Sequence, residues 1–110
     1  MVHSALGPGL LESAYQACLA HELTQRGFAV EQELGLPVVY RGNTLDVGYR
    51  IDLWINKKVI VEIKAVEKLM PIHNAQLLSY LKLSKCKLGF LLNFNVVHMK
   101  DGIKRVVNGI

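Results

Sequence analysis

Residues 49–64 read YRIDLWINKKVIVEIK, and this stretch decides the fold. It contains two apolar, β-branched runs, residues 49–55 and 59–64, separated by the polar segment 56–58. That pattern predicts two antiparallel strands joined by a turn. Charged side chains interrupt the apolar runs at a few positions only, and those positions are the candidate functional residues.

The second strand carries a charged pair on one of its faces. Glu62 and Lys64 are two residues apart, so their side chains share a face, while Val61 and Ile63 point to the other. Two charged side chains on a strand otherwise made of Val and Ile cost free energy unless they are neutralised by partners or serve a function.

The length of the turn decides whether Asp52, on the first strand, joins this pair. A two-residue loop would turn Asp52 away from Glu62. A three-residue loop, residues 56–58, pairs Ile55 with Val59 and puts Asp52 opposite Glu62. Two opposed carboxylates repel and destabilise an ordinary sheet. A divalent cation would remove the repulsion, and carboxylates, a carbonyl and water are the ligands that Mg²⁺ or Mn²⁺ prefers.

In that geometry Lys64 would orient or help to deprotonate the water that attacks a phosphodiester. The competing interpretation is an exposed Asp52 beside a surface ion pair of Glu62 and Lys64. For any one of these residues the competing interpretation is the commoner case. The three together on an apolar hairpin favour a functional site.

Helical spacing of apolar residues predicts two helices, over residues 10–25 and 72–83. Gly27 suits the C′ position that ends the first helix, and Pro71 suits the first position of the second. The residues expected to face the core from the second helix are Ala75, Leu78 and Leu81.

Further extended segments flank these elements. Residues 28–33 and 38–41 form one interrupted strand or two short ones, with a turn at residues 41–43. Residues 87–94 form a strongly apolar strand, and residues 103–107 add an edge strand. The order helix, strands, helix, strand predicts an α/β sandwich around one mixed sheet, with a parallel crossover through the second helix.

Three polar residues on the helices are further candidates. Gln76 and Tyr80 lie at i and i+4, so they share a helix face. The glutamine would hold a phosphate oxygen or a water, and Tyr80 would pack against a base or sugar or else be a half-buried core aromatic. Glu12, in the first turn of the first helix, is explained by the helix dipole or is a further metal ligand.

Composition fits one globular domain over residues 1–110, since 51% of the chain is hydrophobic and no apolar run approaches the length of a membrane span. We expect no signal peptide and a cytoplasmic protein. Cys18 and Cys86 match no metal spacing and are expected to be reduced, partly buried thiols. The net charge of +4 permits a polyanionic partner without demanding one.

Residues 9–15, GLLESAY, match the GxxExxY signature of a family of small bacterial and archaeal proteins within the PD-(D/E)xK nuclease superfamily. The resemblance covers nearly the whole chain and includes the segments 49–52, 61–65, 75–81 and 92–95. It implies a restriction-endonuclease-like αβββαβ core, a mixed sheet flanked by helices. Family members usually carry a fuller helix before the glycine-rich turn, so the resemblance also implies a shortened N-terminal helix here.

The resemblance implies roles for individual residues. Asp52 and Glu62 would bind Mg²⁺ or Mn²⁺, and Lys64 would assist the attack of water. RecB-like nucleases also use a glutamate on the first helix and a Gln-x-x-x-Tyr helix. The matching positions are Glu12, as a third metal ligand, Gln76, as a catalytic residue, and Tyr80, as a substrate-binding residue.

Two functions from different classes follow. The first is a metal-dependent nuclease of a prokaryotic cytoplasm that hydrolyses nucleic acid, with DNA preferred over RNA. The second is a catalytically weak or inactive nuclease-fold module that binds nucleic acid or regulates a partner. An apolar edge strand on so small a domain suits a homodimer under either function.

Overall fold

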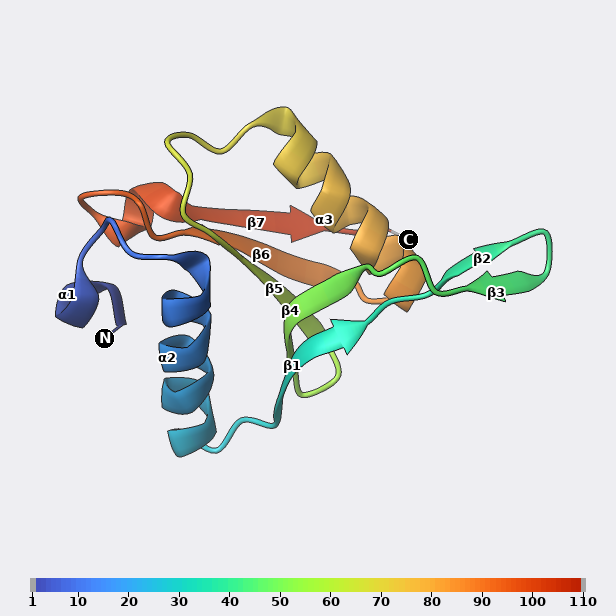
Figure 1. Ribbon diagram of the computed structural model, residues 1–110, viewed down its shortest axis with the longest axis horizontal. Coiled ribbons are helices and arrows are strands. Elements are labelled where there is room, and N and C mark those ends of the chain that lie inside the picture. Colours follow the sequence, from blue (N-terminus) through green and yellow to red (C-terminus); the bar gives the residue numbers. More distant parts are fainter. Residues whose placement is uncertain (1, 110) are drawn as a thin grey trace.

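A five-stranded mixed sheet with helices packed on it forms the body of the protein (Figure 1). The computed structural model describes residues 2–109. In chain order the elements are α1 (Val2–Leu6), α2 (Glu12–Gln25), β1 (Val30–Gly35), β2 (Val38–Tyr40), β3 (Asn43–Leu45), β4 (Arg50–Ile55), β5 (Val59–Lys64), α3 (Pro71–Ser84), β6 (Leu88–Asn93), the 3₁₀ turn η1 (Met99–Gly102) and β7 (Ile103–Val107).

The strand order in the sheet is β1-β4-β5-β6-β7. β5 and β6 run parallel and are joined through α3, whereas the other neighbours are antiparallel. The expected α/β class, with a mixed sheet, a parallel crossover and a last edge strand, is therefore confirmed. Within residues 2–109 no helix is long and apolar enough to cross a bilayer.

Each face of the sheet has its own apolar layer. Under α3 the buried residues are Leu36, Ile51, Ile60, Leu77, Tyr80, Leu81, Cys86, Leu91 and Val106. Under α2 they are Val2, Tyr15, Leu19, Ala20, Leu53, Val61, Ile63 and Phe94. The alternation along β5 follows the expected parity: Ile60 packs under α3, and Val61 and Ile63 pack under α2.

Strands β1 and β4 are kinked where Glu33 faces Asp52. The ladder has pairs on both sides of this point, but Glu33 and Asp52 are not themselves paired, and Glu33 has a φ of 51°. Beyond the kink the side chains change faces, so that Leu53 packs under α2 and Ile51 under α3, although they are two residues apart. A local interruption of this kind bends a strand and re-aims its side chains.

A separate two-stranded hairpin, β2–β3, projects from the body at the right of Figure 1. Its turn, Arg41-Gly42, has positive φ at both residues, 50° and 78°, which is typical of the tight turn that suits a two-residue hairpin. The expected turn at residues 41–43 is confirmed. Of the two alternatives for residues 28–41, the structure shows two short strands, and they belong to different sheets.

Several expectations need correction. The helix predicted over residues 10–25 begins at Glu12, and the short helix α1 precedes it, where residue spacing predicted no helix and only the resemblance implied a shortened one. Of the three α3 residues expected to face the core, Leu81 is buried and Leu78 is partly buried, but Ala75 is exposed. Leu77 and Tyr80 are buried in addition. Apolar residues surround this helix, so spacing alone left its inner face ambiguous, and the fold buries the larger side chains. Cys18 is exposed rather than partly buried.

Candidate active site

The β4–β5 hairpin has the three-residue connection that the acidic site requires. Ile55 pairs with Val59, and Leu53 pairs with Val61. Just beyond the last pair, hydrogen bonds between the two strands bring Asp52 and Glu62 together. The predicted three-residue connection is therefore confirmed, although the backbone pairing itself ends at Leu53 and Val61.

At this position the two strands are joined by hydrogen bonds from backbone amides to carboxylate side chains, in place of backbone-to-backbone bonds. The backbone N–H of Asp52 donates to Glu62 Oε2 at 2.9 Å, and the N–H of Ile63 donates to Asp52 Oδ2 at 2.8 Å. Each carboxylate thus accepts an amide from the opposite strand. These two bonds fix both side chains in place and leave each with a second oxygen for another partner.

Burial and mutual repulsion make these carboxyl groups hard to ionise. The side chain of Glu62 is 4% exposed. Its burial, followed by repulsion from Asp52, raises the pKa of Glu62 from 4.5 to about 8. Burial likewise raises the pKa of Asp52, with a further contribution from Glu33. Such an arrangement stores an unfavourable interaction that a bound cation would relieve.

Lys64 lies on the same face as Glu62, and its ammonium group lowers the pKa of both carboxyls against the larger effect of burial. Among residues 2–109 it forms no ion pair within 4.0 Å. β6 holds this end of β5, since the Phe94 N–H donates to Lys64 O at 2.9 Å. Buried Asn93 fixes the next turn through hydrogen bonds to both backbone groups of Val66. Lys64 is therefore close to the acidic pair and free to meet a ligand.

Helix α3 brings Gln76 and Tyr80 together, as their spacing predicts. Gln76 Nε2 donates to Tyr80 Oη at 3.2 Å. The Tyr80 side chain is 6% exposed, and burial and the nearby Glu62 raise its pKa. Its ring is therefore part of the core, the second of the two interpretations, while its hydroxyl is near the carboxylates. A cavity of about 230 Å³ between α3 and Tyr49 gives Gln76 and Tyr80 access to solvent.

The glycine-rich turn before α2 is held by Tyr15. Its hydroxyl donates to Gly7 O at 2.5 Å and accepts the Leu10 N–H at 3.0 Å, and its ring stacks on Phe94 at 4.5 Å. This fixes the start of α2 and so the position of Glu12, which is exposed. Glu12 adds the smallest of the contributions that raise the pKa of Asp52, so it lies at the margin of the acidic group.

Glu33 is a member of the acidic group that sequence reasoning missed. It sits in the kink opposite Asp52 and raises the pKa of both Asp52 and Glu62. Its effect on Asp52 exceeds that of Glu12. No spacing motif marks it, because its position depends on the pairing of β1 with β4; a glutamate in an extended segment is the only local signal.

The donor set suits a small hard cation. Mg²⁺ is commonly held by one or two carboxylates, with water and substrate phosphate as the other ligands. Asp52 and Glu62 supply two carboxylates whose mutual repulsion a cation would cancel. Residues 2–109 contain no group of three or more His, Cys, Asp and Glu side chains that could hold a metal by themselves. The two carboxylates therefore fit a site that shares its ion with substrate and water rather than a closed protein cage.

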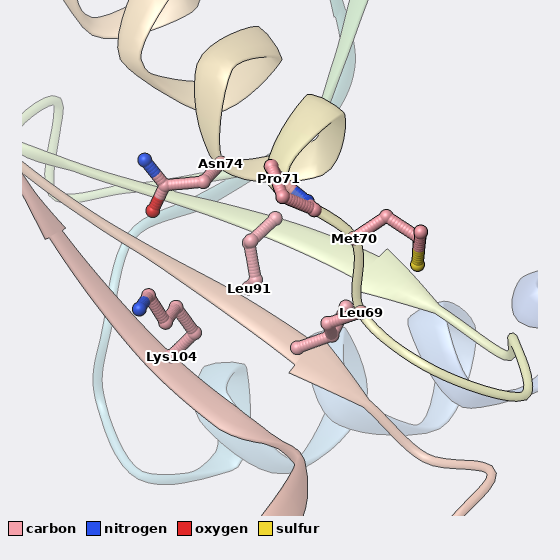
Figure 2. A pocket seen from close by; sticks show the side chains of 6 residues that line it. All are labelled: Leu69, Met70, Pro71, Asn74, Leu91 and Lys104. Carbon is pink, nitrogen blue, oxygen red and sulfur yellow. The ribbon is translucent and has the colours of Figure 1, made fainter.

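A second cavity, of about 370 Å³, lies between the start of α3 and strands β6 and β7 (Figure 2). Its lining residues are Leu69, Met70, Pro71, Asn74, Leu91 and Lys104. None of the predicted site residues is among them, so we do not include this cavity in the site.

Comparison with known proteins supplies one match. A family model described as the PD-(D/E)XK nuclease superfamily matches residues 1–106. No curated protein and no solved structure matches the chain significantly.

Proposed function

Because the chain belongs to the PD-(D/E)XK nuclease superfamily, we propose that it is a divalent-metal-dependent nuclease that hydrolyses phosphodiester bonds in DNA. One observation carries the proposal. Asp52 of β4 and Glu62 of β5 come together, each held by an amide of the other strand, and Lys64 shares the face of β5 that carries Glu62. A paired acidic site next to an ammonium group suits hydrolysis of a phosphate ester.

Asp52 and Glu62 would hold Mg²⁺ or Mn²⁺. Glu12 and Glu33 would add negative charge near the ion without binding it. When bound, the ion would neutralise charge on the phosphate and make water a better nucleophile. The protein's part is to present two carboxylates already fixed by hydrogen bonds, so little reorganisation is needed at the moment of reaction.

The remaining residues act on water and phosphate. Lys64, with no ion-pair partner among residues 2–109, can hold the attacking water and stabilise negative charge as it develops on the phosphate. Gln76 can donate to a phosphate oxygen through its exposed amide. Tyr80 keeps Gln76 in place through their hydrogen bond, so we assign Tyr80 a positioning role.

The test is cleavage of labelled DNA with Mg²⁺, with Mn²⁺ and with EDTA. We expect metal-dependent cleavage that falls by about 10²-fold or more in Glu62→Ala and Lys64→Ala. The matched controls are Glu67→Ala and Lys68→Ala, which remove the same charges at exposed positions outside the sheet. Retained cleavage in both site variants would refute the assignment, and RNA offered in parallel tests the preference for DNA.

One observation favours the second candidate, a binding or regulatory module with little turnover. The acidic group lacks a third ligand close enough to complete a site within residues 2–109. Under this alternative the chain would bind nucleic acid or complete its site with a partner. Salt-dependent binding of DNA with no cleavage in Mg²⁺ or Mn²⁺ would establish it.

The finer assignments form part of the same proposal. Residues 9–15 support membership of the GxxExxY branch and a prokaryotic origin, and two free cysteines suit a cytoplasmic location. The edge strand β7 exposes Ile103 and Val107, which supports a homodimer. Sedimentation velocity over a range of protein concentrations would test the dimer.

A further inference from the structure

Four lysines from two separate connections line one cavity. Its volume is about 480 Å³, and it lies where the β4–β5 turn meets the link between α3 and β6. The lining residues are Lys57, Lys58, Val59, Ser84, Lys85, Cys86, Lys87 and Leu88. No acidic side chain is among them. The cavity is at the start of β5, whereas Glu62 and Lys64 are at its end.

This concentration of charge has no internal compensation. Among residues 2–109, the ion pairs involve other residues, and none includes any of the four lysines. A lysine near the end of α3 is favoured by the helix dipole, which accounts for Lys85 and Lys87. It does not account for Lys57 and Lys58, which approach from the β4–β5 turn. Four lysines at one hollow give this part of the surface a positive potential that attracts an anion.

We propose that this lysine cavity binds phosphate groups of the nucleic acid at a distance from the cleavage site. That the ligand is nucleic acid rests on the proposed function. The charge and shape of the cavity are independent of that function. From Lys58 to Glu62 is four residues along β5, or about 13 Å at 3.3 Å per residue. That span corresponds to about four base pairs of duplex at 3.4 Å each, so a substrate that contacts both places must be longer than about four base pairs.

Lysine suits such a contact because it binds phosphate as a point charge and needs no fixed angle. The cavity therefore anchors the backbone without selecting a sequence. It also supplies positive charge away from the acidic site, whose two carboxyl groups offer none to a polyanion. Small polyphosphates share this chemistry, and the experiment separates them from nucleic acid.

The test is a salt titration of DNA binding in EDTA, so that no cleavage occurs. The variant is Lys58→Gln with Lys87→Gln, one residue from each connection, both without the left-handed φ found at Lys57 and Lys85. The control is a charge-matched pair of exposed lysines elsewhere, Lys68→Gln with Lys100→Gln.

We expect the slope of log K against log salt to fall by about 1.8 in the cavity variant, and affinity at about 0.1 M salt to fall by about 10- to 60-fold. The control should change both far less. Equal losses in the two double variants would mean that only overall charge matters, and would overturn the proposal.

The single tryptophan gives a second readout. Trp54 Nε1–H donates to Cys86 Sγ at 3.4 Å, and Cys86 lines the cavity. DNA should change Trp54 emission in the wild type and in the control but not in the cavity variant. Inorganic tripolyphosphate that binds more tightly than DNA under the same salt would overturn nucleic acid as the ligand.

The two proposals can fail separately. DNA binding through the cavity, with no cleavage by the wild type, would refute the nuclease and leave the anchor standing. Cleavage that requires Glu62, with DNA binding unchanged in the Lys58/Lys87 variant, would refute the anchor and leave the nuclease standing.

Discussion

Replacing Glu62 with glutamine should remove most of the pH dependence of stability in the metal-free protein. Glutamine has nearly the shape of a protonated glutamate, and its carbonyl oxygen can still accept the Asp52 N–H that Glu62 Oε2 accepts in the wild type. It cannot ionise. The variant therefore isolates the free-energy cost of ionising a buried carboxyl group next to a second carboxyl group.

The magnitude follows from the pKa of Glu62, which rises from 4.5 to about 8 on folding. Between these two values the unfolded chain has lost the proton while the folded chain keeps it. Folding therefore takes up a proton, and stability falls as pH rises. The slope approaches 1.4 kcal/mol per pH unit, which gives a loss of about 2 to 3 kcal/mol between about pH 5 and pH 7.

Urea unfolding in EDTA, followed by Trp54 emission at a series of pH values, measures this loss. The wild type should lose stability steadily as pH rises toward 8, whereas Glu62→Gln should stay nearly level and become the more stable protein near neutral pH. Glu67→Gln, at an exposed position outside the sheet, should keep the wild-type slope. Parallel curves for the wild type and Glu62→Gln would refute the reasoning, because they would mean that Glu62 ionises as easily in the fold as in water.

Three further predictions use the same assays. Mg²⁺ should raise the melting temperature of the wild type near neutral pH and flatten its pH profile, since a cation stabilises the ionised pair, and Glu62→Ala should lose this response; an equal response in both proteins would contradict the site. Tyr15→Phe should destabilise the fold by about 1 to 3 kcal/mol in urea, because two hydrogen bonds at the turn before α2 are lost; an unchanged midpoint would show that the ring stack alone holds the turn. Gly102→Ala should cost about 3 kcal/mol or more, because the added methyl would collide with the Asn93 carbonyl oxygen; a wild-type midpoint would mean that η1 shifts at little cost.

The central hairpin was predictable because its signals are local. The polar segment 56–58 is short enough that only two loop lengths had to be weighed. They predict opposite faces for Asp52, and the structure shows the three-residue connection. The same holds for Pro71 at the start of α3 and for Gly27 after α2, where the chemistry of a single residue sets the boundary. The contact between Asp52 and Glu62 agrees with the three-residue connection, but it is made by side-chain hydrogen bonds beyond the end of the ladder.

The rest depends on pairing between distant segments. Glu33 reaches the acidic group only because β1 pairs with β4 and is kinked there, and nothing in residues 28–35 specifies that partner or that kink. The change of face between Ile51 and Leu53 has the same origin. Local alternation predicts one side for both residues, and the kink overrides it.

Helix α3 shows a third limit. Its apolar residues lie on all sides, so the spacing supports more than one inner face. Packing against the sheet selects Leu77 and Tyr80 and leaves Ala75 in solvent. The lysine cavity was equally hidden, since its two pairs of lysines are far apart in sequence and meet only when the α3–β6 link folds against the β4–β5 turn.

The hairpin β2–β3 has a practical consequence for handling the protein. Its two strands pair only with each other, and Val39, Tyr40 and Leu45 are largely in water, so it has no core of its own. A ribbon of this kind opens easily, which makes the Arg41-Gly42 bond the natural point for trypsin to nick the folded chain. For the same reason, an affinity peptide inserted at the tip of this hairpin should disturb the body of the sheet little.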